Sequence, residues 1–202
     1  MIVHPTGKSQ SSFKEKRSEF IGILIPINSA NTVAKELKYY RKTYYDSRHV
    51  AWAYRRDENG NVVENSSDDG EPSGLAGSPI LGALRKKNIV NVACFVVRYF
   101  GGVKLGKRGL IDAYRTSAEL AIQAGKFKPW IPKTVVQIEC DYKYAGNISR
   151  IFEKNNWHIL KDHSEEKLIW DVQVHRENTE QFMEEIKSAA EGKAHCRIKG
   201  RE

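Results

Sequence analysis

The stretch that most constrains the fold is residues 90–124, where an apolar segment, a glycine-rich junction and a helical pattern follow one another. Residues 90–97 predict a buried strand, because the run is short, apolar and rich in β-branched side chains. From about Gly106 to Ala124 the small and apolar positions recur at helical spacing, which predicts an amphipathic helix. The core-facing stripe of this helix is Leu110, Ala113, Tyr114, Ser117, Ala118 and Ala121.

The junction combines glycines with cations. It reads Arg98-Tyr99-Phe100-Gly101-Gly102-Val103-Lys104-Leu105-Gly106-Lys107-Arg108-Gly109. Glycine lets backbone N–H groups approach a ligand closely, and the first turn of a helix leaves N–H groups unpaired at its positive dipole end. The junction therefore predicts an anion site with phosphate as the expected ligand. The structural alternative is a turn that joins strand to helix and leaves its cations in solvent.

Residues 101–107 fit the first seven positions of the phosphate-cradling motif G-x-x-x-x-G-K. A nucleotide-hydrolysing P-loop is excluded, because Arg108 stands where Ser or Thr must hold magnesium. The aromatic pair Tyr99 and Phe100 adjoins the cations and is suited to stacking on a base. The expected anion- or RNA-binding residues are Arg98, Tyr99, Gly101, Gly102, Lys104, Lys107, Arg108 and Arg115.

A second polar segment, the acidic loop, consists of Ser67, Asp68, Asp69, Gly70, Glu71 and Pro72. An EF-hand that starts at Asn65 is excluded, since Ala76 falls where a bidentate Glu must sit. Three interpretations stay open. The loop is solvated and carries no function, or its carboxylates pair with Arg98, Lys104 or Arg108 and hold the two loops together, or Asp68, Asp69 or Glu71 works with His49 in acid–base catalysis. His49 lies in a predicted strand, where a histidine is more often structural.

The chain is expected to form two domains, residues 1–128 and 129–202. Gly125 to Pro132 ends the long helix and holds two prolines that prevent its continuation. The N-terminal domain is expected to hold a strand at 13–27, a helix capped by Ser29 or Asn31, a strand at 48–55, a hairpin turn at Asn59-Gly60 and a short helix with Pro79 at its first position. The C-terminal part reads strand, helix, strand, strand, helix, strand, which is the ferredoxin-like βαββαβ pattern.

Charge is divided unevenly between these parts. Residues 1–132 carry 21 Lys and Arg against 12 Asp and Glu, a net +9, whereas residues 133–202 carry 12 against 13, a net −1. A basic half favours a nucleic-acid or ribosome partner, because binding to phosphates releases counterions. Cys94, Cys140 and Cys196 show no C-x-x-C spacing, so neither zinc nor a disulfide framework is expected, and no other metal or cofactor is.

Neither a secretory signal nor an apolar run of membrane-spanning length is present, so a cytoplasmic location without membrane contact is expected. The oligomeric state stays open.

Ordered blocks across residues 13–124 carry a family resemblance. They are His49-x-Ala51-x-Ala53-Tyr54, then Ser67-Asp68-Asp69-Gly70-Glu71-Pro72-x-Gly74-x-Ala76-Gly77-x-Pro79-Ile80-Leu81, then Val96-Val97-Arg98-Tyr99-Phe100-Gly101-Gly102-x-x-Leu105-Gly106, and Gly109-Leu110-x-x-Ala113-Tyr114. In these blocks the chain resembles the IMPACT/YigZ family. The remaining third looks like the C-terminal domain of the bacterial members.

The resemblance implies an α+β fold, with a first domain of the ribosomal-protein-S5 second-domain type and a ferredoxin-like second domain similar to the last domain of the translocation elongation factor. Eukaryotic relatives bind a large ribosome-associated activator and so restrain a stress kinase that senses uncharged tRNA. The expected function is a non-catalytic translation-associated regulator that binds RNA or ribosomal phosphate, or an acidic protein surface. The alternatives are an enzyme acting on a phosphorylated small molecule and a pure protein adaptor.

Three positions depart from the family pattern. Ala51 stands where members often have Cys, so thiol chemistry at that position is excluded. Arg108 and Arg115 replace glycines that are usual in the family. Both arginines add positive charge near the loop-helix junction, which favours anion binding.

Overall fold

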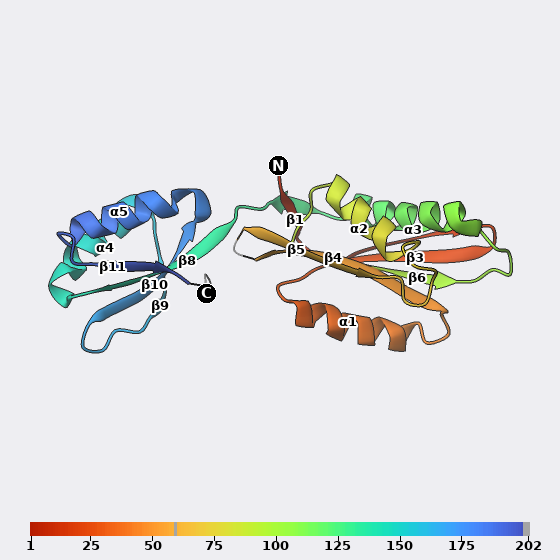
Figure 1. The fold of residues 1–202 in the computed structure, drawn as a ribbon, viewed down its shortest axis with the longest axis horizontal. Coiled ribbons are helices and arrows are strands. Elements are labelled where there is room, and N and C mark those ends of the chain that lie inside the picture. The colour runs from red at the N-terminus through yellow and green to blue at the C-terminus, as the bar shows by residue number, and fades with distance from the viewer. Residues whose placement is uncertain (59, 200–202) are drawn as a thin grey trace. The chain divides into compact units, whose positions relative to one another are not determined.

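The computed structural model describes residues 1–58 and 60–199 and divides into two compact units, unit 1 (Met1–Trp130) and unit 2 (Ile131–Glu202) (Figure 1). Each unit has its own hydrophobic core. The elements of unit 1 are β1 (Val3–Pro5), β2 (Ser9–Glu15), β3 (Ser18–Pro26), α1 (Ala30–Thr43), β4 (His49–Glu58), β5 (Asn61–Ser67), α2 (Gly77–Lys86), β6 (Val92–Tyr99), α3 (Gly106–Gln123) and β7 (Phe127–Pro129).

Unit 1 is built on a five-stranded antiparallel sheet with the strand order β2-β3-β6-β4-β5. Helices α2 and α3 cover one face of this sheet and α1 covers the other (Figure 1). Because side chains alternate along a strand, central strand β6 contributes to both cores. Cys94 and Val96 pack toward α2 and α3, whereas Phe95 and Val97 pack toward α1.

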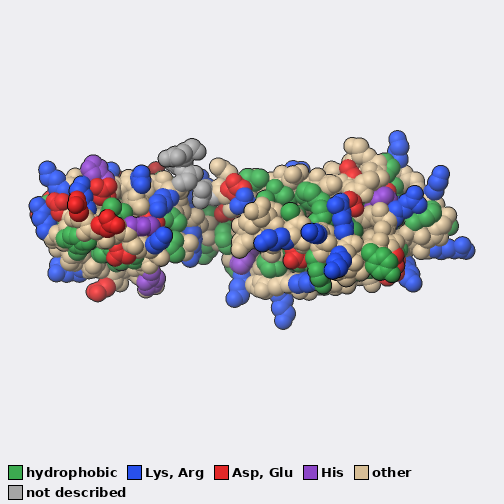
Figure 2. Space-filling model, turned by 90° about the horizontal axis from the view of Figure 1, so that it is seen from below, with side chains coloured by type: hydrophobic (Ala, Val, Ile, Leu, Met, Phe, Trp, Pro, Cys, Tyr) green, Lys and Arg blue, Asp and Glu red, His purple; other side chains and the backbone are tan. Residues whose placement is uncertain are grey.

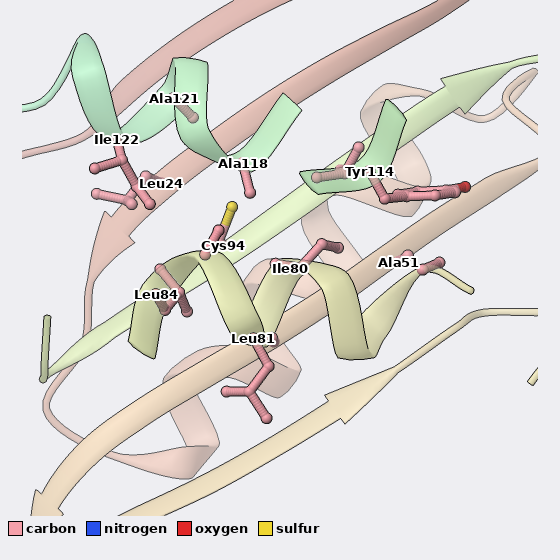
Figure 3. Close-up of a cluster of buried hydrophobic side chains, with 14 of the residues drawn as sticks. Leu24, Ala51, Ile80, Leu81, Leu84, Cys94, Tyr114, Ala118, Ala121 and Ile122 are labelled. Atoms are coloured by element: carbon pink, nitrogen blue, oxygen red, sulfur yellow. The ribbon is translucent and has the colours of Figure 1, made fainter. Parts of the chain in front are cut away.

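The core under α2 and α3 confirms the stripe predicted for the long helix, all of whose members are buried in α3. Figure 3 shows Tyr114, Ala118 and Ala121 of α3 pointing toward the sheet beside Ile80 and Leu84 of α2. This close packing requires a glycine in β3, because a Cβ on Gly22 would lie 2.4 Å from the Ser117 carbonyl oxygen.

The prediction of one strand over residues 13–27 is wrong. β2 and β3 form a hairpin in which Glu15 pairs with Ser18, and the turn consists of Lys16 and Arg17. Both turn residues have positive φ, 44° and 67°, a conformation usually taken by glycine or asparagine. The sequence lacks the usual turn residues here, so the strand appeared continuous.

The start of α2 also differs from the prediction. Pro79 is the third helical residue and not the first, because the helix begins at Gly77. At the other helix start, Ser29 is the N-cap of α1 and accepts a hydrogen bond from the Thr32 N–H at 3.3 Å, which decides between the two predicted caps. Asn59 of the predicted Asn59-Gly60 turn lies outside the described residues, while Glu58 and Asn61, on either side of that turn, are paired across the β4–β5 hairpin.

Unit 2 confirms the predicted βαββαβ order. Its elements are β8 (Lys133–Cys140), α4 (Ala145–Asn155), β9 (Ile159–Asp162), β10 (Leu168–His175), α5 (Thr179–Ala189) and β11 (His195–Ile198). The sheet order is β11-β8-β10-β9, with every pair antiparallel. The apolar side chains of β8 and β10, such as Val136 and Val172, form one core with Ile148 of α4 and Phe182 of α5. Within residues 1–58 and 60–199, no helix is long and apolar enough to cross a membrane.

Candidate anion site at the glycine loop

Asp68 of the acidic loop caps the N-terminus of α2. Its Oδ1 accepts hydrogen bonds from the N–H groups of Ala76 and Gly77, at 2.9 and 2.8 Å, and its Oδ2 accepts one from Gly74 at 2.9 Å. Burial opposes the charged form of this carboxyl, but the three backbone hydrogen bonds outweigh burial and lower the pKa of Asp68. The carboxylate therefore fixes the loop to the helix it caps.

Asp69 fixes the other side of the loop and orients His49. Its carboxylate pairs with Arg41 of α1 and accepts a hydrogen bond from the Val50 N–H at 2.6 Å. The carbonyl oxygen of Asp69 lies 2.7 Å from His49 Nδ1. Because a carbonyl only accepts, Nδ1 carries the proton, and neutral His49 keeps an acceptor at Nε2, which lies 3.9 Å from Glu71 Oε1.

Glu71, Arg98 and Tyr114 form a buried polar cluster. The Arg98 Nη1 and the Tyr114 hydroxyl, the latter at 2.9 Å, both donate to Glu71 Oε1. Burial and the neighbouring Glu71 charge raise the pKa of Tyr114, so its hydroxyl stays a donor. The Arg98 guanidinium carbon lies 5.6 Å from each of the ring centres of Phe20 and Phe100. The predicted pairing of the two loops is thus present between Glu71 and Arg98.

Three of the four glycines of the junction, Gly101, Gly102 and Gly106, have identifiable structural roles. A Cβ on Gly101 would lie 2.0 Å from the carbonyl carbon and oxygen of Arg17, so Gly101 is required by its close approach to the β2–β3 turn. Its N–H donates to Ser18 Oγ at 3.2 Å. Gly102 and Gly106 have φ of +84° and +74°, which only glycine adopts without strain.

Helix α3 begins without a cap among the described residues. Leu105 is its N-cap residue and provides no side-chain hydrogen bond, and the first turn holds no acidic residue. That turn instead carries the exposed cations Lys107 and Arg108. Since cations are unfavourable at the positive end of a helix, this end is electrostatically suited to an anion.

The two loops enclose a cavity of about 440 Å³, the glycine-loop cavity. Pairing of β4 with β6 puts His49 directly opposite Arg98, and the acidic loop closes over both. The charged and polar side chains of the lining are those of Arg48, His49, Glu71, Arg98, Lys104 and Lys107, and Gly106 adds backbone. The apolar lining is Pro72, Leu75, Phe100, Leu105 and Leu110.

Five of the eight residues predicted to bind the anion are outside the lining of this cavity, namely Tyr99, Gly101, Gly102, Arg108 and Arg115. Tyr99 packs on the α1 side of the sheet, because it is one residue removed from Arg98 along β6. Its hydroxyl donates to Asp46 at 2.9 Å, and burial together with Asp46 raises the pKa of Tyr99 to about 12. Arg108 and Arg115 are exposed on α3 outside the lining, and Arg115 Nη1 lies 3.0 Å from Asp112 Oδ1.

Several residues of the site carry no signal in the sequence. Arg48 and Leu75 lie on its wall, and Arg41 holds Asp69 from α1. These residues come from separate elements and belong to no motif that marks them. Tyr114 was assigned to the core, although the need of a buried tyrosine hydroxyl for a partner is a signal that a polar group lies beside it.

The basic surplus of unit 1 is not confined to the glycine loop. Figure 2 looks onto the side of unit 1 that carries α1 and shows Lys and Arg side chains distributed over it. Exposed cations on that helix include Lys35, Lys38 and Lys42. What distinguishes the glycine loop is therefore the convergence of cations with a cavity and a helix N-terminus, and not charge alone.

In unit 2 the buried carboxylate of Asp171 is the main polar centre. It accepts hydrogen bonds from Gln137 at 2.9 Å and Lys199 at 2.6 Å and lies 2.8 Å from His163 Nε2. Burial acts against its charged form, but these partners prevail and lower the pKa of Asp171 to about 2. Across residues 1–58 and 60–199, no three His, Cys, Asp or Glu side chains are arranged to hold a metal ion.

Comparison with known proteins agrees with this architecture. The family model described as the Impact N-terminal domain matches residues 16–122. The chain is similar to IMPACT family member YvyE of Bacillus subtilis, at 28% identity over 89% of this chain and 82% of that protein. It is also similar to IMPACT family member YigZ of Escherichia coli, at 29% identity over 72% of each chain. A crystal structure of a hypothetical protein superimposes with a TM-score of 0.75 at 23% identity, covering 100% of this chain and 98% of the other, and shares its fold.

Proposed function

The chain belongs to the IMPACT family, and from that premise we propose that it is a cytosolic, non-catalytic regulator associated with translation. In this proposal unit 1 binds the phosphates of RNA or of the ribosome through the start of α3. The first unit is then of the S5 second-domain type and the second is related to the last domain of the translocation elongation factor. Both shapes recur in proteins that contact RNA.

The observation that carries the proposal is the uncapped start of α3, around which Lys104, Lys107 and Arg108 are exposed. Free N–H groups at a helix start and neighbouring cations are what a phosphate backbone contacts. Arg115 extends the positive surface along the same helix. The net charge of +9 on residues 1–132 adds long-range attraction.

Binding is favoured over catalysis because each carboxylate of the acidic loop already has a structural partner. Asp68 caps α2, Asp69 pairs with Arg41, and Glu71 pairs with Arg98. A general base needs a lone pair that faces the substrate, and these carboxylates are used within the fold. Their arrangement supports a loop that shapes the site and carries no reaction.

The test is co-sedimentation of the full-length protein with ribosomes, and filter binding to RNA, over a range of salt concentrations. We expect Arg108→Glu with Arg115→Glu to weaken binding at least tenfold and to reduce the slope of log K against log salt by about one to two. Both side chains are exposed, so folding is expected to be unchanged.

The matched control is Lys35→Glu with Lys38→Glu, which makes the same change of charge on α1, across the sheet. This control is expected to bind nearly as well as the natural protein. Equal losses in the two variants would mean that net charge alone drives binding. Retained binding in the α3 variant would overturn the proposal and leave an acidic protein surface as the partner to test.

A further inference from the structure

The glycine-loop cavity has a chemistry of its own that the exposed arginines of α3 do not share. We propose that it binds a phosphomonoester attached to a planar group, of the kind present in a 5′-nucleoside monophosphate and at the 5′-phosphorylated end of an RNA. This site rests on the proposed function, because it shares the start of α3, Lys104 and Lys107 with the RNA contact, and it deepens that function by naming the ligand class.

Two independent features of the cavity indicate where the phosphate group of the ligand binds. One is the uncapped start of α3, an 18-residue helix. The other is Arg98, which lines the cavity, is only 6% exposed and has an Nε without a hydrogen-bond partner among the described residues. A buried guanidinium that is incompletely paired within the fold is a strong donor for a phosphate oxygen.

The charge of the lining suits a dianion. Four cations, Arg48, Arg98, Lys104 and Lys107, face the cavity against one carboxylate, Glu71. A carboxylate ligand would neutralise one of these positive charges. A phosphomonoester carries close to two negative charges at neutral pH and would neutralise more of them. The excess of cations therefore matches a phosphate monoester better than a carboxylic acid.

His49 adds one directed polar contact. Its Nδ1 proton is held by the Asp69 carbonyl at 2.7 Å, so the neutral ring offers only Nε2 as an acceptor in the cavity. A ligand hydroxyl, such as that of a ribose, donates to this atom. Fixing one ring nitrogen through a backbone carbonyl is also what keeps the imidazole in a single orientation.

The planar group is indicated by the apolar wall. Phe100 is 42% exposed, and one side of its ring lies against the Arg98 guanidinium, which leaves the other side for stacking. Leu75 and Leu110 continue this wall. A volume of about 440 Å³ is in the range of small-ligand sites and exceeds the need of a bare phosphate ion.

The experiment titrates the full-length, ¹⁵N-labelled protein with AMP, adenosine and inorganic phosphate, using calorimetry and amide chemical shifts. We expect AMP to bind at least tenfold more tightly than inorganic phosphate and adenosine to bind weakly or not at all. The amide signals of Gly106, Lys107 and Arg108 should shift with AMP and with phosphate. Absence of AMP binding, or adenosine that binds as tightly as AMP, would overturn the proposal.

Two substitutions locate the site without disturbing the buried ion pair. In His49→Asn the side-chain amide nitrogen takes the place of Nδ1 toward Asp69, but the position of Nε2 is lost, so AMP affinity should fall several-fold at an unchanged Tm. Phe100→Ala should weaken AMP several-fold and leave inorganic phosphate unchanged. An unchanged ratio of the two affinities in Phe100→Ala would contradict stacking of a planar group.

The Phe100→Ala variant separates this proposal from the proposed function. It is expected to lose AMP affinity and to keep its binding to internal RNA phosphates, because those contacts use the cations of α3 and not the ring. Competition by short RNAs identifies the source of the ligand. If 5′-phosphorylated RNA displaces AMP and 5′-hydroxyl RNA does not, RNA ends enter the site, and if neither does, the ligand is a free mononucleotide. Equal displacement by both RNAs would contradict a monoester site.

Discussion

At the scale of single residues, Glu71 is the position on which the two loops depend. Its carboxylate is the acceptor for both Arg98 and Tyr114, and all three residues are at least nine-tenths buried. Loss of one member leaves the others buried and without a partner. Breaking a buried pair in this way is far more destabilising than removing a surface ion pair.

We therefore expect Glu71→Ala to lower the free energy of unfolding of unit 1 by about 3–5 kcal/mol. The double variant Glu71→Leu with Arg98→Met should recover much of this loss, because it removes both charges together. Urea denaturation measures both changes in the free energy of unfolding, and hydrogen exchange of unit 1 peptides shows that they arise in unit 1. A loss below about 1 kcal/mol in Glu71→Ala would show that solvent reaches the pair.

At the scale of elements, two glycines of unit 1 have opposite structural roles. Gly101 has no room for a side chain, since a Cβ there would lie 2.0 Å from the Arg17 backbone. Gly82, within α2, has nothing within 4 Å of its Cβ position. The conformation at Gly101 is fixed by a neighbouring turn, whereas Gly82 only lowers helix propensity.

Gly101→Ala is therefore expected to destabilise unit 1 and to shift the amide signals of both the glycine loop and the β2–β3 turn. Gly82→Ala is the matched control and should stabilise the protein by about 0.5–1 kcal/mol. Thermal denaturation and ¹⁵N spectra measure the two effects. A stable Gly101→Ala with unchanged β2–β3 signals would contradict the contact.

Much of the architecture is predictable at this scale, because it depends on periodic patterns. The α3 stripe and the βαββαβ order follow from helical and strand periods that the chain shows clearly. The Lys16-Arg17 turn was not predictable, since its left-handed residues lack the usual signature. Side chains alternate between the two faces of β6, so Tyr99 and Arg98 point to opposite faces of the sheet. This could have been predicted from the sequence, but the adjacency of the two residues suggested that they share a role.

The site itself was predictable only in part. The glycines and cations of the junction mark a helix start, and the acidic loop stands out by composition. The role of Asp68 as the cap of α2 depends on a chain reversal over residues 68–77, and the orientation of His49 depends on a backbone carbonyl. Neither contact leaves a pattern in the sequence.

At the scale of the whole molecule, the two units differ in charge and in the way they hold their buried polar groups. The basic surplus belongs to residues 1–132, and residues 133–202 are close to neutral. Unit 2 contains one dominant carboxylate, Asp171, which is 5% exposed and bound by Gln137, Lys199 and His163. Because this carboxyl group titrates in acid, the free energy of unfolding of unit 2 depends on pH in that range.

The pKa of Asp171, lowered to about 2 from the usual 3.8, gives this link its sign. A depressed carboxyl pKa stabilises the folded state above the unfolded value and loses that contribution as pH falls through the folded value. Asp171→Asn should therefore destabilise unit 2 by about 1–3 kcal/mol at pH 7. The difference from the natural protein should shrink as pH falls from about 4 to about 2.

Hydrogen exchange of unit 2 peptides at several pH values measures this effect without interference from unit 1. Gln137→Leu is a useful companion, because it removes a neutral partner and leaves Lys199 and His163 in place. A constant difference between Asp171→Asn and the natural protein across this pH range would contradict the assignment.

The contact of Gly101 with the backbone of Arg17 has a mechanical consequence. With no side chain between the two segments, a displacement of the β2–β3 turn is expected to be passed directly to Gly101, the neighbour of Phe100 in the cavity wall.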